Sequence, residues 1–219
     1  MKLTERFFAE AEAYWDKAAV KPFIRKMAAG TLKPERWRFY MLQDYIYIKE
    51  YIKIIALTIV QADELEEIAY LEKLIGETLN ETCRVHIPNM KEIGITREDI
   101  RKTEPAAVSL AYVRYMQSEA SGGGVLSGLT ALLNCSWSYM YIVQQAMKKY
   151  HDEVCASTYR SWFEAYACNE YMAANQELID AVDRISAGID PAEEDRLCGI
   201  FLECCKYEDA FWDMLDQEK

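Results

Sequence analysis

Apolar side chains recur at three- and four-residue intervals along most of the chain, which is the spacing of one face of an α-helix. Glycine and proline fall mainly between these segments, and no alternating β-branched run reaches the length of a strand. The pattern predicts an all-α bundle of eight or so helices in one domain over residues 1–219. The expected helical segments cover residues 3–17, 22–29, 34–61, 63–92, 105–120, 125–150, 153–168, 170–187 and 191–217.

The ends of these segments carry residues typical of helix termini. Asp190 before Pro191, with Glu193 three residues after Asp190, is typical of a capped helix start. Thr96 is expected to cap a brief turn through residue 100. The three glycines at 122–124 lack the preceding strand and the Lys-Ser/Thr of a phosphate-binding loop, so they predict a turn between two helices.

The charge balance excludes several classes of partner. The net charge is −11, and no basic run exceeds Lys148-Lys149. Nucleic acids and anionic membranes need a basic surface, so we expect neither as a partner. The charged start of the chain lacks the apolar run of a signal peptide, and no apolar stretch approaches the ~18–20 residues that span a bilayer. We therefore expect a cytoplasmic protein. Its seven cysteines, odd in number and without a CxxC, predict reduced thiols.

Asp44 is the first side chain that an ordinary helix would not bury. It lies four residues after Tyr40, three before Tyr47 and seven before Tyr51, so all four project from one stripe of a helix. One interpretation is a polar pocket in which Asp44 binds a flat heterocycle between tyrosine walls. The other is a buried acid satisfied by its tyrosines. Tyr112 and Tyr166, on two further helices, leave the same two interpretations open.

Cys135 and Tyr139 form an i, i+4 pair, so a thiol and a phenol share one helix face. Most buried cysteines only fill space in a core. Tyr139, with Ser138 beside it, offers hydrogen-bond donors that would stabilise a thiolate or orient an attacking thiol. The other six cysteines lack such neighbours, and Cys204 and Cys205 are expected in the core or in a pocket wall.

Glu208 interrupts the apolar stripe of the last helix. Phe211 and Trp212 share its face one turn later, and Phe201 does so two turns earlier. Desolvation would disfavour the charged form of such a carboxyl group, which tunes it to hold and return a proton. The alternative is an acid at the edge of the stripe that reaches solvent or pairs with Arg or Lys.

Histidine-dependent chemistry is disfavoured. Neither His86 nor His151 follows a glutamate at three residues' distance, so the Glu-x-x-His pairs of di-iron bundles are missing. No histidine falls in the first two expected helices to ligate a haem. We interpret His86 as a structural hydrogen-bonding residue, and we expect no metal and no cofactor.

Short motifs spread over nearly the whole chain resemble the thiaminase II (TenA) family, whose fold is that of haem oxygenase. No single motif is long, but their order and spacing are specific. They are Pro22-Phe23, Leu42-Gln43-Asp44 with Tyr47, AYVRYM at 111–116, ALLNCSWSY at 131–139, WFEAY at 162–166 and YEDAFW at 207–212. The resemblance implies an all-α, haem-oxygenase-like bundle, and Cys135 places the chain in the cysteine-containing branch.

The resemblance also implies roles for individual residues. The cysteine matching Cys135 is the family's nucleophile, and the glutamate matching Glu208 is its proton donor. An aspartate and a tyrosine matching Asp44 and Tyr139 hold an aminopyrimidine, and further tyrosines line the site. We therefore expect Cys135, Glu208, Asp44 and Tyr47 to be catalytic, and Asp44, Tyr47, Tyr112, Tyr139 and Tyr166 to bind the substrate.

The implied reaction is hydrolysis of 4-amino-5-aminomethyl-2-methylpyrimidine to the 5-hydroxymethyl pyrimidine for thiamin salvage, with thiaminase II side activity. Asn134, Ser136 and residues 167–170 depart from the family pattern, which leaves the choice among aminomethyl-pyrimidine, a formylamino derivative and thiamin open. Asp44 and Glu208 are interchangeable as donors to the ring and to the leaving group. Family members are commonly homotetramers, which we expect here. The alternative is a non-catalytic pyrimidine- or thiamin-binding or regulatory protein on the same fold.

Overall fold

The computed structural model describes residues 1–217. Helices account for most of them, and no strand occurs in this range, so the predicted all-α class is confirmed. The chain divides into two compact units. The first unit comprises Met1–Leu32 and the chain from Leu129 onward, and the second comprises Lys33–Gly128. That residues 1–219 form one domain stays a prediction.

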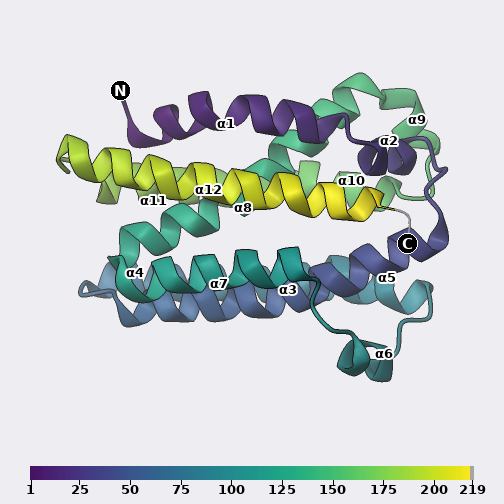
Figure 1. The fold of residues 1–219 in the computed structure, drawn as a ribbon, viewed down its shortest axis with the longest axis horizontal. Coiled ribbons are helices and arrows are strands. Elements are labelled where there is room, and N and C mark those ends of the chain that lie inside the picture. Colours follow the sequence, from purple (N-terminus) through teal and green to yellow (C-terminus); the bar gives the residue numbers. More distant parts are fainter. Residues whose placement is uncertain (218–219) are drawn as a thin grey trace. The chain divides into compact units, whose positions relative to one another are not determined.

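The first unit is built around two long helices that lie side by side, α1 and α12 (Figure 1). Their facing aromatic rings form its core, where Phe7 stacks on Phe201 with ring centroids 4.4 Å apart. Both rings lie on the apolar stripes that the sequence pattern predicts. The helices with residues in this unit are α1 (Leu3–Ala19), α2 (Pro22–Ala28), α8 (Gly124–Lys149), α9 (His151–Ala156), α10 (Arg160–Ala167), α11 (Asn169–Ile185) and α12 (Pro191–Asp216).

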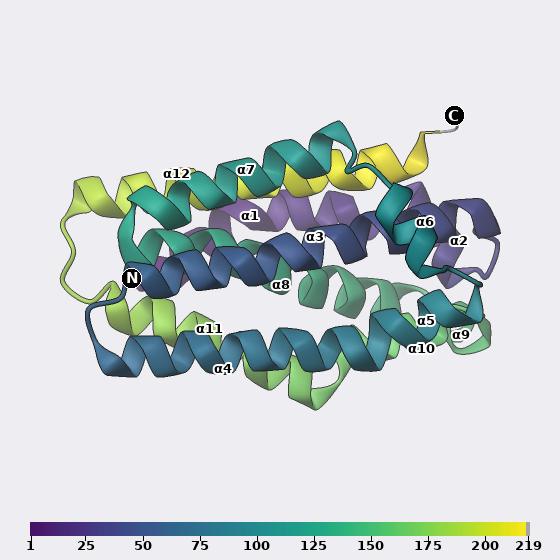
Figure 2. The same cartoon turned by 90° about the horizontal axis from the view of Figure 1, so that it is seen from below.

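In the second unit the central helix α3 contacts both α7 and α4 (Figure 2). Because α3 is covered on two sides, it buries a wide face that includes Tyr40, Asp44, Tyr47 and Tyr51. The helices of this unit are α3 (Pro34–Val60), α4 (Leu65–Glu81), the π-helix η1 (Thr82–His86), α5 (Ile87–Glu92), α6 (Arg97–Lys102) and α7 (Ala107–Gly122).

Several predicted helix termini are confirmed. The Asp190 side chain accepts a hydrogen bond from the Glu193 amide at 2.9 Å. The Thr96 hydroxyl accepts a hydrogen bond from the Asp99 amide, and the Asp99 carboxylate accepts one from the Thr96 amide, which completes a capping box at the start of α6. The turn at residues 122–124 joins α7 to α8, and Gly124 has the positive φ of 76° that favours glycine.

The prediction of one continuous helix over 63–92 is wrong. The segment contains α4, then the five-residue π-helix η1, then α5. Pro88 explains the interruption, because a proline has no N–H to donate and its ring clashes with the carbonyl four residues earlier. The wider π turn immediately before Ile87-Pro88 accommodates both effects. The π turn also changes the direction in which the following side chains point. A buried face predicted by continuing the 3.6-residue repeat of α4 is therefore wrong beyond Glu81.

The predicted helix over 153–168 is also wrong, because it is two helices, α9 and α10. Hydrogen bonds between side chains and the backbone stabilise the non-helical residues between α9 and α10. Ser157 donates to the Met27 carbonyl at 2.6 Å and accepts from the Tyr159 amide at 3.0 Å. The Tyr159 hydroxyl donates to the Leu32 carbonyl at 3.0 Å. These long-range partners cannot be recognised from local sequence.

Candidate active site

Asp44 pairs with a histidine rather than with its neighbouring tyrosines. The Asp44 carboxyl group lies on α3 and is 4% exposed, and His86 at the end of η1 is 1% exposed. The distance from His86 Nε2 to Asp44 Oδ2 is 2.6 Å. Sequence reasoning missed this pair. Two signals pointed to it: a buried acid needs a donor, and the chain has only two histidines.

The charge state of His86 follows from its surroundings. Burial disfavours the imidazolium, but the charge and hydrogen bond of Asp44, followed by the charge and backbone of Glu81, outweigh burial and raise the pKa of His86. A raised pKa means that the ion pair stabilises the fold fully below the ordinary histidine value of 6.5. That contribution is lost as the pH rises through the higher folded pKa.

Tyr47, one turn after Asp44 on the buried face of α3, contacts two other tyrosine rings. Tyr47 stacks on Tyr112 with ring centroids 5.6 Å apart and an interplanar angle of 27°. The Tyr47 hydroxyl lies 3.5 Å from the sulfur of Met116. Tyr51 lies beside Tyr47, with centroids 6.1 Å apart. The second unit thus contains two contacting pairs, Asp44 with His86 and Tyr47 with Tyr112, and Asp44 and Tyr47 lie one turn apart on α3.

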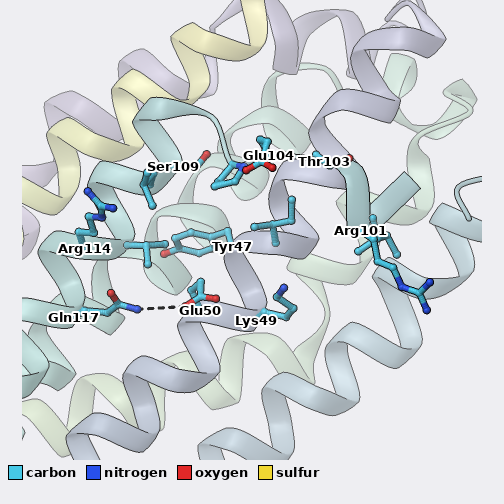
Figure 3. Close-up of a pocket in the computed structure, with 14 residues that line it drawn as sticks. Tyr47, Lys49, Glu50, Arg101, Thr103, Glu104, Ser109, Arg114 and Gln117 are labelled. Carbon is cyan, nitrogen blue, oxygen red and sulfur yellow. Dashed lines mark hydrogen bonds between the residues drawn. The ribbon is translucent and has the colours of Figure 1, made fainter. Parts of the chain in front are cut away.

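Tyr47 also forms part of the wall of a cavity of about 490 Å³ in the second unit (Figure 3). The hydroxyl of Ser109, which lines the same cavity, is buried and has no hydrogen-bond partner among residues 1–217. Gln43 fixes the nearby loop, because its side chain donates to the Glu104 carbonyl and accepts from the Ala106 amide. A cavity of this size suits a small molecule. Asp44 does not line it.

The thiol of Cys135 lies on α8 in the first unit and is half-buried. Tyr139, one turn later, is buried among aromatic rings. Its ring centroid is 5.2 Å from that of Tyr166 and 5.3 Å from that of Trp212. Cys135 and Tyr139 therefore lie one turn apart on α8, and aromatic rings of α10 and α12 contact Tyr139. None of the seven cysteines, all within the described range, forms a disulfide.

Glu208 occupies the apolar face of α12, as the stripe predicts, and is only 5% exposed. One turn before it, the Cys205 thiol donates to the side-chain oxygen of Asn134 on α8 at 3.0 Å. Burial, followed by the charge of Glu208, raises the pKa of Cys205, so this thiol stays protonated and donates. The bond joins the residue before Cys135 to the turn before Glu208.

Two lysines anchor α12 directly after Glu208. Lys21, 5% exposed, donates to the Asp209 carbonyl at 2.6 Å and lies 2.7 Å from the Asp213 carboxylate. Lys17 lies 2.7 Å from the Asp209 carboxylate. Burial opposes the charged form of Asp209, but the hydrogen bonds from Lys17 and Lys21 outweigh it and lower the pKa of Asp209.

Lys21 also forms an ion pair with the mostly buried Asp209 carboxylate. We expect Lys21→Met to lower the free energy of unfolding by about 3 kcal/mol, because it removes this ion pair and leaves the carboxylate buried. Lys17→Met is the matched control, since Lys17 is 60% exposed and its pair should contribute below about 1 kcal/mol. Denaturant unfolding measures both variants. The Asp209 pKa is lowered, so the wild-type advantage should be present at pH 7 and shrink as the pH falls below about 4. Equal losses in the two variants would contradict this account.

Among the described residues, no group of three or more His, Cys, Asp or Glu side chains is arranged to hold a metal ion. Among residues 1–217, no helix combines the length and apolar character needed to cross a membrane.

Comparison with known proteins identifies the family. The model of the TENA/THI-4/PQQC family matches residues 8–218. An aminopyrimidine aminohydrolase of Halalkalibacterium halodurans is 31% identical, and the match covers 100% of this chain and 97% of the relative. A solved TenA homologue from P. horikoshii OT3 superposes with a TM-score of 0.88 at 32% identity, covering 98% of both chains.

A third comparison concerns the fold alone. A domain of unknown function with a heme oxygenase-like fold from Shewanella denitrificans OS217 superposes with a TM-score of 0.77 at 16% identity, covering 98% of this chain and 92% of the other. The predicted haem-oxygenase-like fold is thereby confirmed. The family match, which spans nearly the whole chain, shows that this protein belongs to the TENA/THI-4/PQQC family.

Proposed function

We propose that this protein hydrolyses 4-amino-5-aminomethyl-2-methylpyrimidine to the 5-hydroxymethyl pyrimidine and ammonia, a reaction of thiamin salvage, with thiaminase II side activity. The observation that carries the proposal is the full-length 31% identity to an aminopyrimidine aminohydrolase. The side chains support it, because the chain carries a half-buried thiol and two buried carboxyl groups at the positions that the TenA motifs imply.

In the proposed mechanism the Cys135 thiolate adds to the ring carbon that lies between a ring nitrogen and the substituted carbon. The new C–S bond interrupts the aromatic ring, and the electron pair moves to the ring nitrogen, which takes up a proton. Asp44 holds the aminopyrimidine through this step. Covalent addition replaces direct displacement by water, which is slow because the intact ring resists it.

The second half of the reaction expels the amine and restores the ring. Glu208, as general acid, protonates the exocyclic amine, and ammonia leaves as the C–N bond breaks. Water then adds to the exocyclic methylene carbon and loses a proton. The C–S bond breaks to release the thiolate, and the ring nitrogen gives up the proton that it took on addition, which restores the aromatic ring. The sum is substrate plus water giving the hydroxymethyl pyrimidine plus ammonia, with no change in oxidation state. The assignment of Glu208 rather than Asp44 to the leaving group is part of the proposal.

Purified protein tests the proposal on two substrates, the aminomethyl-pyrimidine and thiamin, with products separated by chromatography. We expect hydrolysis of both and a higher kcat/KM for the aminopyrimidine. No turnover on either, combined with measurable pyrimidine binding by calorimetry, would instead identify a non-catalytic binding protein. We also propose a cytoplasmic homotetramer, for which light scattering gives the mass directly.

A further inference from the structure

The mechanism above leaves the buried His86 without a role. His86 is the only residue with a hydrogen bond to Asp44 in the described structure, at 2.6 Å from Nε2 to Oδ2. We propose that His86 is a positioning residue: it holds the Asp44 carboxylate through Oδ2 so that Oδ1 is presented to the 4-aminopyrimidine ring. This inference rests on the proposed function, because it assigns the substrate to Asp44.

The backbone around His86 is built for this contact. His86 is the last residue of the π-helix η1, and Pro88 follows two residues later. A π turn inserts one extra residue into the helical repeat and so redirects the side chains around it, and such turns are frequent at functional sites. Here the redirected side chain is an imidazole that meets a carboxylate from α3. A regular α-helix over the same residues would present a different face to α3.

The polarity of the pair sets what Asp44 can do. The charged groups facing the imidazole are Asp44 from α3 and Glu81 at the end of α4, both acids. They raise the pKa of His86 despite its burial, and Nε2, 2.6 Å from a carboxylate oxygen, is placed to donate a hydrogen bond to it. An Asp44 carboxylate that accepts from His86 has one defined orientation. Because His86 binds Oδ2, Oδ1 is the oxygen that we assign to an amino or ring N–H of the substrate.

Kinetics of His86→Leu and His86→Gln test the inference, with His151→Leu as the matched control because His151 is the only other histidine and is exposed. Loss of a hydrogen bond to a charged group changes a binding constant by about 10- to 100-fold. We expect His86→Leu to raise KM for the aminopyrimidine by about that factor and to change kcat less. His86→Gln, which retains an N–H donor, should recover part of the loss. A purely structural role would lower the active fraction, and so kcat, without raising KM.

Imidazole NMR provides a readout that does not require turnover. With two histidines, His151→Leu assigns the signals, and Asp44→Asn should lower the pKa of the His86 signal. An unchanged His86 titration in Asp44→Asn would overturn the inference, and so would an unchanged KM in folded His86→Leu when Asp44→Ala raises it. Either result leaves the proposed hydrolysis intact. If the wild type hydrolyses neither substrate, the proposed function fails instead, and unchanged binding of the hydroxymethyl pyrimidine by His86→Leu would then overturn the positioning role separately.

Discussion

Cys135→Ser should lower kcat for the aminopyrimidine by about 1,000-fold or more while the protein stays folded. A serine hydroxyl is far less ionised than a thiol near neutral pH and is a weaker nucleophile, so addition to the ring fails. Loss of a nucleophile typically removes most of an enzyme's rate enhancement. Cys135 is only half-buried, so the change of one atom should cost little stability. Product chromatography and thermal unfolding measure the two effects.

Cys83 and Cys155 supply the control for this result. Both are exposed, and we assign neither a role in the reaction. Cys83→Ser and Cys155→Ser should therefore retain wild-type kcat and KM. A folded Cys135→Ser variant with activity near that of the wild type would refute the nucleophile assignment.

Glu208→Gln should produce the second large loss of kcat, and the size of this loss should depend on the leaving group. The amine of the aminomethyl-pyrimidine needs a proton to depart as ammonia, whereas the thiazolium of thiamin departs as a neutral thiazole without one. General acid catalysis is worth about 100- to 10,000-fold, so we expect a loss of that order on the aminopyrimidine and a smaller one on thiamin. Steady-state kinetics on both substrates measure the difference.

Glu203→Gln is the matched control, because Glu203 lies on the same helix and pairs with Lys206 at 2.8 Å near the surface. Glu203→Gln should leave kcat and KM for both substrates unchanged. Equal losses on the two substrates in Glu208→Gln would argue that Glu208 acts on the ring or on binding rather than on the leaving group. Asp44 would then be the candidate for the general acid.

Local sequence was sufficient for the fold class, for most helices and for several helix ends. The caps at Thr96 and Asp190 depend on residues within three positions of each other, so spacing alone predicts them. The buried position of Glu208 follows in the same way, because a helical stripe is a local pattern. Each of these features is decided by neighbours along the chain.

Contacts between distant residues could not be predicted in this way. The Asp44–His86 pair joins residues 42 positions apart, and it depends on a π turn that a 3.6-residue repeat does not anticipate. The thiol of Cys205 reaches Asn134 across 71 positions, so a residue that looks like a departure from the family pattern is in fact a hydrogen-bond acceptor. The break between α9 and α10 depends on Ser157 and the Met27 carbonyl.

The central claim is that Cys135 reacts with the substrate, and alkylation tests it most directly. A Cys83→Ser, Cys155→Ser protein is treated with iodoacetamide, and peptide mass spectrometry follows labelling of Cys135 as activity is lost. We predict that labelling and inactivation proceed at the same rate and that the hydroxymethyl pyrimidine slows both. Complete labelling of Cys135 with activity retained would contradict the account.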